Sequence, residues 1–89
     1  MKELIERMQL EGMDVVIVKS WFKEFNACLD KCKALNNDGQ LYFNSDSYKE
    51  ADRLYKNLYG FVLGLSSLYY ITTELAFKYI DELIDSFNF

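Results

Sequence analysis

Apolar residues recur at steps of three and four between residues 18 and 35, and this spacing constrains the fold more than any other feature. It is the period of an α-helix with one buried face. Asp14 before it and Gly39 after it are typical of helix ends, so we predict a helix over 14–36. Its apolar stripe consists of Val18, Trp21, Phe22, Phe25, Cys28, Leu29, Cys32 and Leu35.

Three further segments carry the same period, at residues 2–11, 47–70 and 73–87. Eighty-nine residues suffice for one domain, and 51% hydrophobic residues with no Pro and four Gly argue against disorder and turn-rich β folds. We predict an all-α fold with a single domain, 1–89. It is a small helical bundle of three to four helices: a short N-terminal helix, two long helices and a C-terminal helix. The predicted core contains Trp21, Phe22, Phe25, Leu29, Leu54, Leu58, Phe61, Leu65, Phe77 and Ile80.

Chain length and capping residues predict that 47–70 and 73–87 form two separate helices. An unbroken helix over 47–87 would be about 60 Å long, which a compact monomer of this size could not cover. Thr72 can accept a hydrogen bond from the first turn of a new helix, so we place the break there. Ser47 and Glu50 match a capping box, which predicts that the preceding helix begins at residue 47.

The segment 57–73 carries no charge, and its helical part is apolar around the whole circumference. It is short for a membrane span and contains three Tyr, two Ser and two Thr, so we expect no membrane span. Gly60 and Gly64 form a GxxxG pair, which predicts that another helix crosses closely there. A domain of this size cannot bury all of 58–71. Either this helix is central and enclosed by the others, or its surplus apolar surface docks on a second copy of the chain or on a different protein. Of these we expect self-association into a homo-oligomer.

Catalytic and metal-binding arrangements are restricted because the chain has no His. The side chain that titrates most readily near neutral pH is therefore missing, and no common nucleotide-binding, zinc-protease or nucleophile motif is present. Cys28 and Cys32 share one helical turn, but two thiolates supply only half of a structural zinc site. We expect two buried, reduced thiols, no metal, no cofactor, no catalytic residue and no enzymatic activity.

The charge balance favours a protein partner. Fourteen acidic residues against ten basic ones give a net charge of −4. Nucleic acids and anionic membranes require a basic footprint, so nucleic acid is not an expected partner. Residues 1–7 are charged and lack the apolar run of a signal peptide, which favours a cytoplasmic location.

Two groups of residues are candidates for binding that partner. Aromatic side chains often dominate the affinity of protein interfaces, and carboxylates aligned along a helix can steer a basic partner. The aromatic candidates are Tyr55, Tyr59, Tyr69 and Tyr70, and the acidic candidates are Glu74, Asp81, Glu82 and Asp85.

These features predict a non-enzymatic protein-binding module. Residues with AT-rich codons are frequent, with seven Phe and seven Tyr, which is typical of low-GC bacteria and their phages. The sharper hypothesis is a small regulator or inhibitor from a phage or other mobile element that sequesters a host protein. A nucleic-acid-handling or defence enzyme is a candidate target, because a row of carboxylates can imitate phosphates. The alternative is a homodimeric structural or accessory subunit without an inhibitory role.

Overall fold

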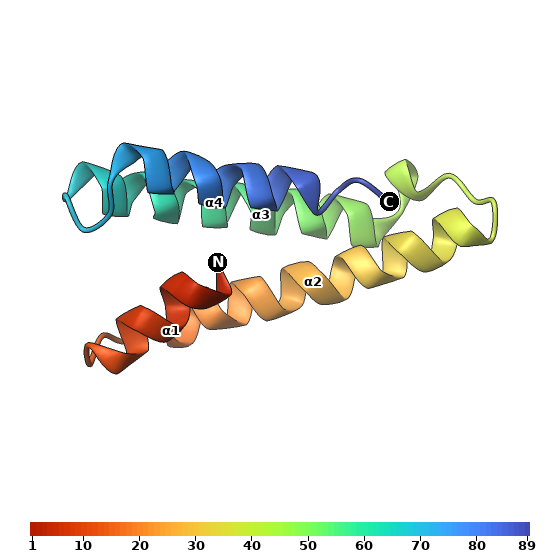
Figure 1. Cartoon of the computed structure of the whole chain (residues 1–89). Coiled ribbons are helices and arrows are strands. Elements are labelled where there is room, and N and C mark those ends of the chain that lie inside the picture. Colours follow the sequence, from red (N-terminus) through yellow and green to blue (C-terminus); the bar gives the residue numbers. More distant parts are fainter.

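The computed structural model describes all 89 residues and contains helices and turns but no strands. Figure 1 shows two layers of antiparallel helices, with the short α1 beside the first half of α2 and α4 alongside α3. The predicted all-α bundle is confirmed. The elements are α1 (Lys2–Leu10), α2 (Val16–Asn37), the 3₁₀ turn η1 (Tyr42–Asn44), α3 (Asp46–Ser67) and α4 (Thr73–Asp85).

The predicted break before the last helix is confirmed, and the hydroxyl oxygen of Thr72 accepts a hydrogen bond from the backbone N–H of Leu75 at 3.1 Å. The second helix begins two residues later than predicted. Asp14 does not cap it directly, although its carboxylate accepts from the backbone N–H of Val16 at 3.0 Å. Side-chain acceptors near these helix starts satisfy backbone donors that have no partner inside the helix.

The predicted capping box at the start of α3 is wrong. Ser45 is the cap, and its hydroxyl oxygen accepts from the backbone N–H of Tyr48 at 3.1 Å. Ser47 lies inside the helix, and Glu50 pairs with the guanidinium of Arg53 instead of reaching back to the helix start. Only Ser47 is followed three residues later by a Glu, but the extended backbone that a cap requires lies at Ser45.

Helices α1, α2 and α3 end in the same backbone motif, in which one residue takes a left-handed conformation. Glycine occupies that position after α1 and α2, as Gly12 with φ of 80° and Gly39 with φ of 75°. After α3 the residue is Tyr69, with φ of 60°. Its N–H donates to the carbonyl of Ser66 at 3.0 Å, and the next N–H donates to that of Leu65 at 2.9 Å. Such a backbone costs a residue with a Cβ about 1–2 kcal/mol.

One apolar cluster fills the space between the two helical layers, and Phe25 lies at its centre with no exposed surface. Of the predicted core, Leu29, Leu54, Leu58, Leu65 and Ile80 are also buried, and Trp21, Phe22 and Phe61 pack half-buried at its edge.

The prediction that Phe77 belongs to the core is wrong, because the side chain is 57% exposed. The inward side of α4 is formed by Ala76, Tyr79, Ile80 and Leu83. At 100° per residue, Phe77 lies about 60° from Ile80, on the side away from Leu83. The buried stripe of α4 therefore passes through Ala76 and Tyr79, not through Phe77.

The predicted helix crossing at Gly60 and Gly64 is also wrong. Both glycines are exposed, and a Cβ added at either would meet no atom within 4 Å. The buried side of α3 runs through Leu58 and Val62, and Gly60 lies about 200° around the helix from Leu58. α3 therefore has one buried side and one exposed side and is not enclosed by the other helices. It ends at Ser67, three residues before the predicted end at residue 70.

The bundle is elongated and exposes more surface than its mass requires. Its principal extents are 43 × 24 × 17 Å and its radius of gyration is 14.1 Å, against about 12 Å for a compact domain of this length. The accessible surface is 5913 Å², whereas about 5,400 Å² is typical of a monomer of this mass. Surplus surface of this kind is available for contact with other molecules.

Candidate protein-binding surface

Exposed apolar side chains from α3 and α4 form the first candidate surface. We define this α3–α4 face by Tyr59 and Leu63 of α3 and by Phe77 and Ile84 of α4, all more than a third exposed. Ile84 lies with Tyr55 beside one shallow groove of about 290 Å³, which places this flank of α4 next to α3. The α3–α4 face therefore contains Tyr59 of the predicted aromatic group.

Tyr55 supports this surface from beneath. Its ring is half-buried, stands edge-on to Phe87 at 5.8 Å between ring centroids, and lies 6.0 Å from the ring of Tyr59. Burial raises the pKa of the Tyr55 hydroxyl. Tyr59 thus packs against a neighbour that is itself held in place. Its side chain therefore loses less conformational entropy when a partner binds.

Three of the four predicted carboxylates line the outer side of α4. Glu74, Asp81 and Asp85 are exposed and lie opposite the buried positions of the helix; we refer to these three as the acidic ridge. Glu82 lies about a quarter turn away, and its carboxylate is 3.4 Å from the terminal amine of Met1. The structure therefore separates Glu82 from the other three.

The two remaining tyrosines have different surroundings. Tyr69 protrudes from the turn between α3 and α4 with 94% of its surface exposed. Tyr70 is half-buried: the guanidinium of Arg7 lies 4.8 Å from the centre of its ring, and its hydroxyl donates to the carboxylate of Glu11. This hydrogen bond lowers the pKa of Glu11 and raises the pKa of Tyr70. Tyr70 thus joins two turns of the chain.

A second apolar surface was not predicted, and we call it the apolar end. Its residues lie in or next to the α1–α2 and α3–α4 turns, which are both at the left of Figure 1. Leu10, Val16 and Ile17 are apolar but lie outside the buried stripes of α1 and α2. This position outside the stripes is the feature of the sequence from which their exposure could have been predicted. The apolar end consists of Leu10, Met13, Val16, Ile17, Leu68 and Tyr69.

Cys28 and Cys32 are free and buried, as expected from their place in the stripe. Burial raises the pKa of both thiols, which favours the unreactive protonated form. The fold assembles no group of three or more Cys, Asp or Glu side chains that could hold a metal ion. None of the helices combines the length and hydropathy that crossing a membrane requires.

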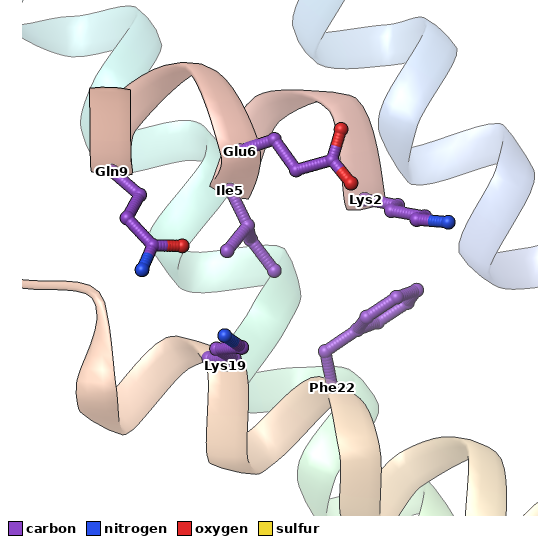
Figure 2. Close-up of a pocket in the computed structure, with 6 residues that line it drawn as sticks. All are labelled: Lys2, Ile5, Glu6, Gln9, Lys19 and Phe22. Atoms are coloured by element: carbon purple, nitrogen blue, oxygen red, sulfur yellow. The ribbon is translucent and has the colours of Figure 1, made fainter. Parts of the chain in front are cut away.

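A groove also runs between α1 and α2. Figure 2 shows Ile5 and Phe22 pointing into it from the two helices, with Lys2 and Glu6 together on one side and Lys19 opposite. Its volume is about 260 Å³, below the range of about 300–1,000 Å³ typical of small-molecule sites.

Comparisons with protein-family models, with curated proteins and with solved structures found no match to this chain. Function is therefore inferred from the residues and surfaces of the chain itself.

Proposed function

We propose that this chain is a non-enzymatic protein-binding module that docks through its α3–α4 face onto a partner with basic residues around an apolar centre. The observation that carries the proposal is the position of the acidic ridge along the exposed side chains of Phe77 and Ile84. Aromatic and aliphatic residues bordered by charged groups resemble the anchor and rim of a protein interface.

The apolar part of this surface supplies most of the affinity in our proposal. Fully burying one large apolar side chain contributes about 1.5–3 kcal/mol, whereas an exposed ion pair contributes about 0–1 kcal/mol. The acidic ridge accelerates encounter with a basic partner and disfavours acidic ones. This division of roles also disfavours nucleic acid as a partner, because phosphates would meet carboxylates.

The biological role that we propose is sequestration of a host protein by a small regulator or inhibitor from a mobile element, acting in the cytoplasm. A protein with a basic nucleic-acid-binding groove suits the acidic ridge, since spaced carboxylates present negative charge as a phosphate backbone does. A homodimeric accessory subunit is the second candidate, and the apolar end favours it by offering a contact surface away from most of the acidic ridge.

The test is capture from a lysate of the cells that carry the gene, with three immobilised forms of the chain. One is the natural sequence, one carries Phe77→Ser and Ile84→Ser, and the control carries Leu41→Ser. Leu41 is 71% exposed and lies outside the α3–α4 face, so the control removes exposed apolar surface elsewhere on the chain.

A protein retained by the natural chain and the control but lost from the double variant supports the proposal, once direct binding is reproduced with both proteins purified. Equal retention by all three forms contradicts it, as does failure of every retained protein to bind when purified. Circular dichroism verifies that the variants keep their helices, which exposed positions should allow.

A further inference from the structure

We propose that the apolar end binds a second copy of this chain and forms a dimer with two-fold symmetry. The α3–α4 turn of one copy, with Leu68 and Tyr69, packs against the α1–α2 turn region of the other, with Leu10, Val16 and Ile17. This inference uses a surface separate from the α3–α4 face, so it does not rest on docking through that face, and it specifies the contact of the homodimer that is the second candidate above.

The two parts of the apolar end are held together within one chain. The hydroxyl of Tyr70 donates to the carboxylate of Glu11, and the guanidinium of Arg7 contacts both the Tyr70 ring and Glu11. These contacts join the α3–α4 turn to the α1–α2 turn across the end of the bundle (Figure 1). A second copy would therefore meet both turns in a fixed arrangement.

Tyr69 is the residue that points to a binding role. It occupies the left-handed position that Gly12 and Gly39 fill in the two equivalent motifs of the chain, and its side chain makes no aromatic contact in the monomer and is 94% exposed. A glycine there would relieve backbone strain. Strained residues are held in place by the surrounding structure and cluster at functional sites, and an exposed aromatic at such a position is a candidate anchor for an interface.

The exposed area is large enough for a dimer. The six side chains of the apolar end are between 40% and 94% exposed, which at about 150 Å² for a full side chain gives on the order of 600 Å². Two such patches facing each other would bury roughly 1,200 Å², the lower limit of stable protein interfaces. Interfaces at this lower limit are typically weak, so we expect dimerisation to depend on concentration.

Charge also favours this site for contact between identical copies. Residues 68–73 carry no charge. In the α1–α2 turn, Glu11 is paired with Arg7 at 3.3 Å, so Asp14 is the one charged residue of that turn without an ion pair. Two of the three carboxylates of the acidic ridge lie about 12 and 18 Å beyond the start of α4. These distances exceed the roughly 8 Å over which charges interact at physiological salt, so repulsion from Asp81 and Asp85 is screened at the apolar end, and Glu74 is the one carboxylate of the ridge that lies close to it.

The geometry suits two-fold symmetry because the patch has two unlike parts side by side. In a two-fold dimer, if the α3–α4 turn of one copy contacts the α1–α2 turn region of its partner, the partner's α3–α4 turn makes the same contact in return. The protruding Tyr69 would contact the exposed side chains of Val16 and Ile17, and the same contact would recur once.

The experiment measures mass and thermal stability for the same four proteins. Sedimentation equilibrium over the micromolar range is run on the natural chain, Tyr69→Gly, Leu68→Ser and the control Leu41→Ser. We expect a monomer–dimer equilibrium that weakens at least about tenfold in Tyr69→Gly and Leu68→Ser, as truncation of interface anchors does. The control should leave the equilibrium unchanged, because Leu41 lies outside the apolar end.

Melting temperature at low concentration, where the chain is monomeric, separates an interface role from a structural one. We expect Tyr69→Gly to melt at a higher temperature than the natural chain, because the strain at φ of 60° is relieved. A natural chain that remains monomeric at all concentrations would overturn the proposal. So would a dimer that Tyr69→Gly leaves intact, or one that the control weakens equally.

Discussion

The hydroxyl of Tyr70, in the turn between α3 and α4, donates a hydrogen bond to the carboxylate of Glu11, in the turn between α1 and α2. These residues are far apart in the chain, and their contact joins the two helical layers at one end. The bond requires a charged Glu11 and a protonated Tyr70. Its contribution to stability therefore depends on pH in both directions.

We expect Tyr70→Phe to lower the melting temperature at neutral pH. The bond lowers the pKa of Glu11, so its stabilisation is present above the ordinary glutamate pKa and is lost as pH falls through the lowered value. It raises the pKa of Tyr70, so that stabilisation is present below the ordinary tyrosine pKa and is lost as pH rises through the raised value. Melting curves of both proteins across pH should converge at the two extremes, and a constant difference would contradict this explanation.

Truncation of two phenylalanines should give opposite results. Phe25 has no exposed surface and lies edge-on to Phe87 at 5.5 Å, so Phe25→Ala should cost about 3–5 kcal/mol of unfolding free energy. Phe77 is exposed, and Phe77→Ala should change stability by about 0.5 kcal/mol or less. Denaturant titrations measure both. Equal losses would show that α4 presents a different side to the core.

Alanine at the two exposed glycines of α3 should stabilise the chain. Neither Gly60 nor Gly64 would bring a Cβ within 4 Å of another atom, and glycine inside a helix costs about 0.5–1 kcal/mol relative to alanine. We therefore expect Gly60→Ala and Gly64→Ala each to raise the unfolding free energy by that amount. A loss of stability would reveal a helix packed closely against these glycines.

The helices were predictable because local patterns determine them. The stripe through Phe25 and Leu29 in α2 and the cap at Thr72 depend only on nearby residues. The side that α4 buries was not predictable in this way, since stripes through Phe77 or through Ala76 both have the helical period. The choice between them depends on where α1 and α3 lie, which is a tertiary property.

The candidate surfaces were predictable only in part. Tyr59 and the carboxylates of the acidic ridge were identified because exposed aromatics and aligned charges are visible in the sequence. The apolar end was not, because its residues come from segments around 10–17 and 68–69 that the fold places at one end of the bundle. Tyr69 was a candidate for binding a partner because it is aromatic. Its left-handed backbone was not predicted, because glycine usually fills that position.

The two cysteines should react slowly in the folded protein. Cys32 has no exposed surface, Cys28 is almost fully buried, and burial raises the pKa of both thiols. Thiolates are the reactive form, so we expect a thiol reagent to modify both residues rapidly only after denaturation. Rapid modification of the native chain at neutral pH would show that the core around α2 opens readily.

Reversal of the acidic ridge should affect association more than dissociation. Asp81 and Asp85 are exposed at the border of the α3–α4 face, and charges at the rim of an interface act mainly by steering. We expect Asp81→Lys combined with Asp85→Lys to slow binding to a captured basic partner, with a smaller effect on its release. Surface-immobilised binding kinetics measure both rate constants, and an unchanged association rate would remove the acidic ridge from the mechanism.

The most direct test of the account is the dissociation rate of that partner, measured for the natural chain, Tyr59→Ala and Phe77→Ala at two salt concentrations. If exposed aromatics on the α3–α4 face hold the partner, each truncation should speed dissociation by at least about tenfold. Doubling the salt should have little effect, because buried apolar contacts are not screened. An affinity that collapses when the salt is doubled, yet survives both truncations, would contradict the account and assign the binding to the carboxylates.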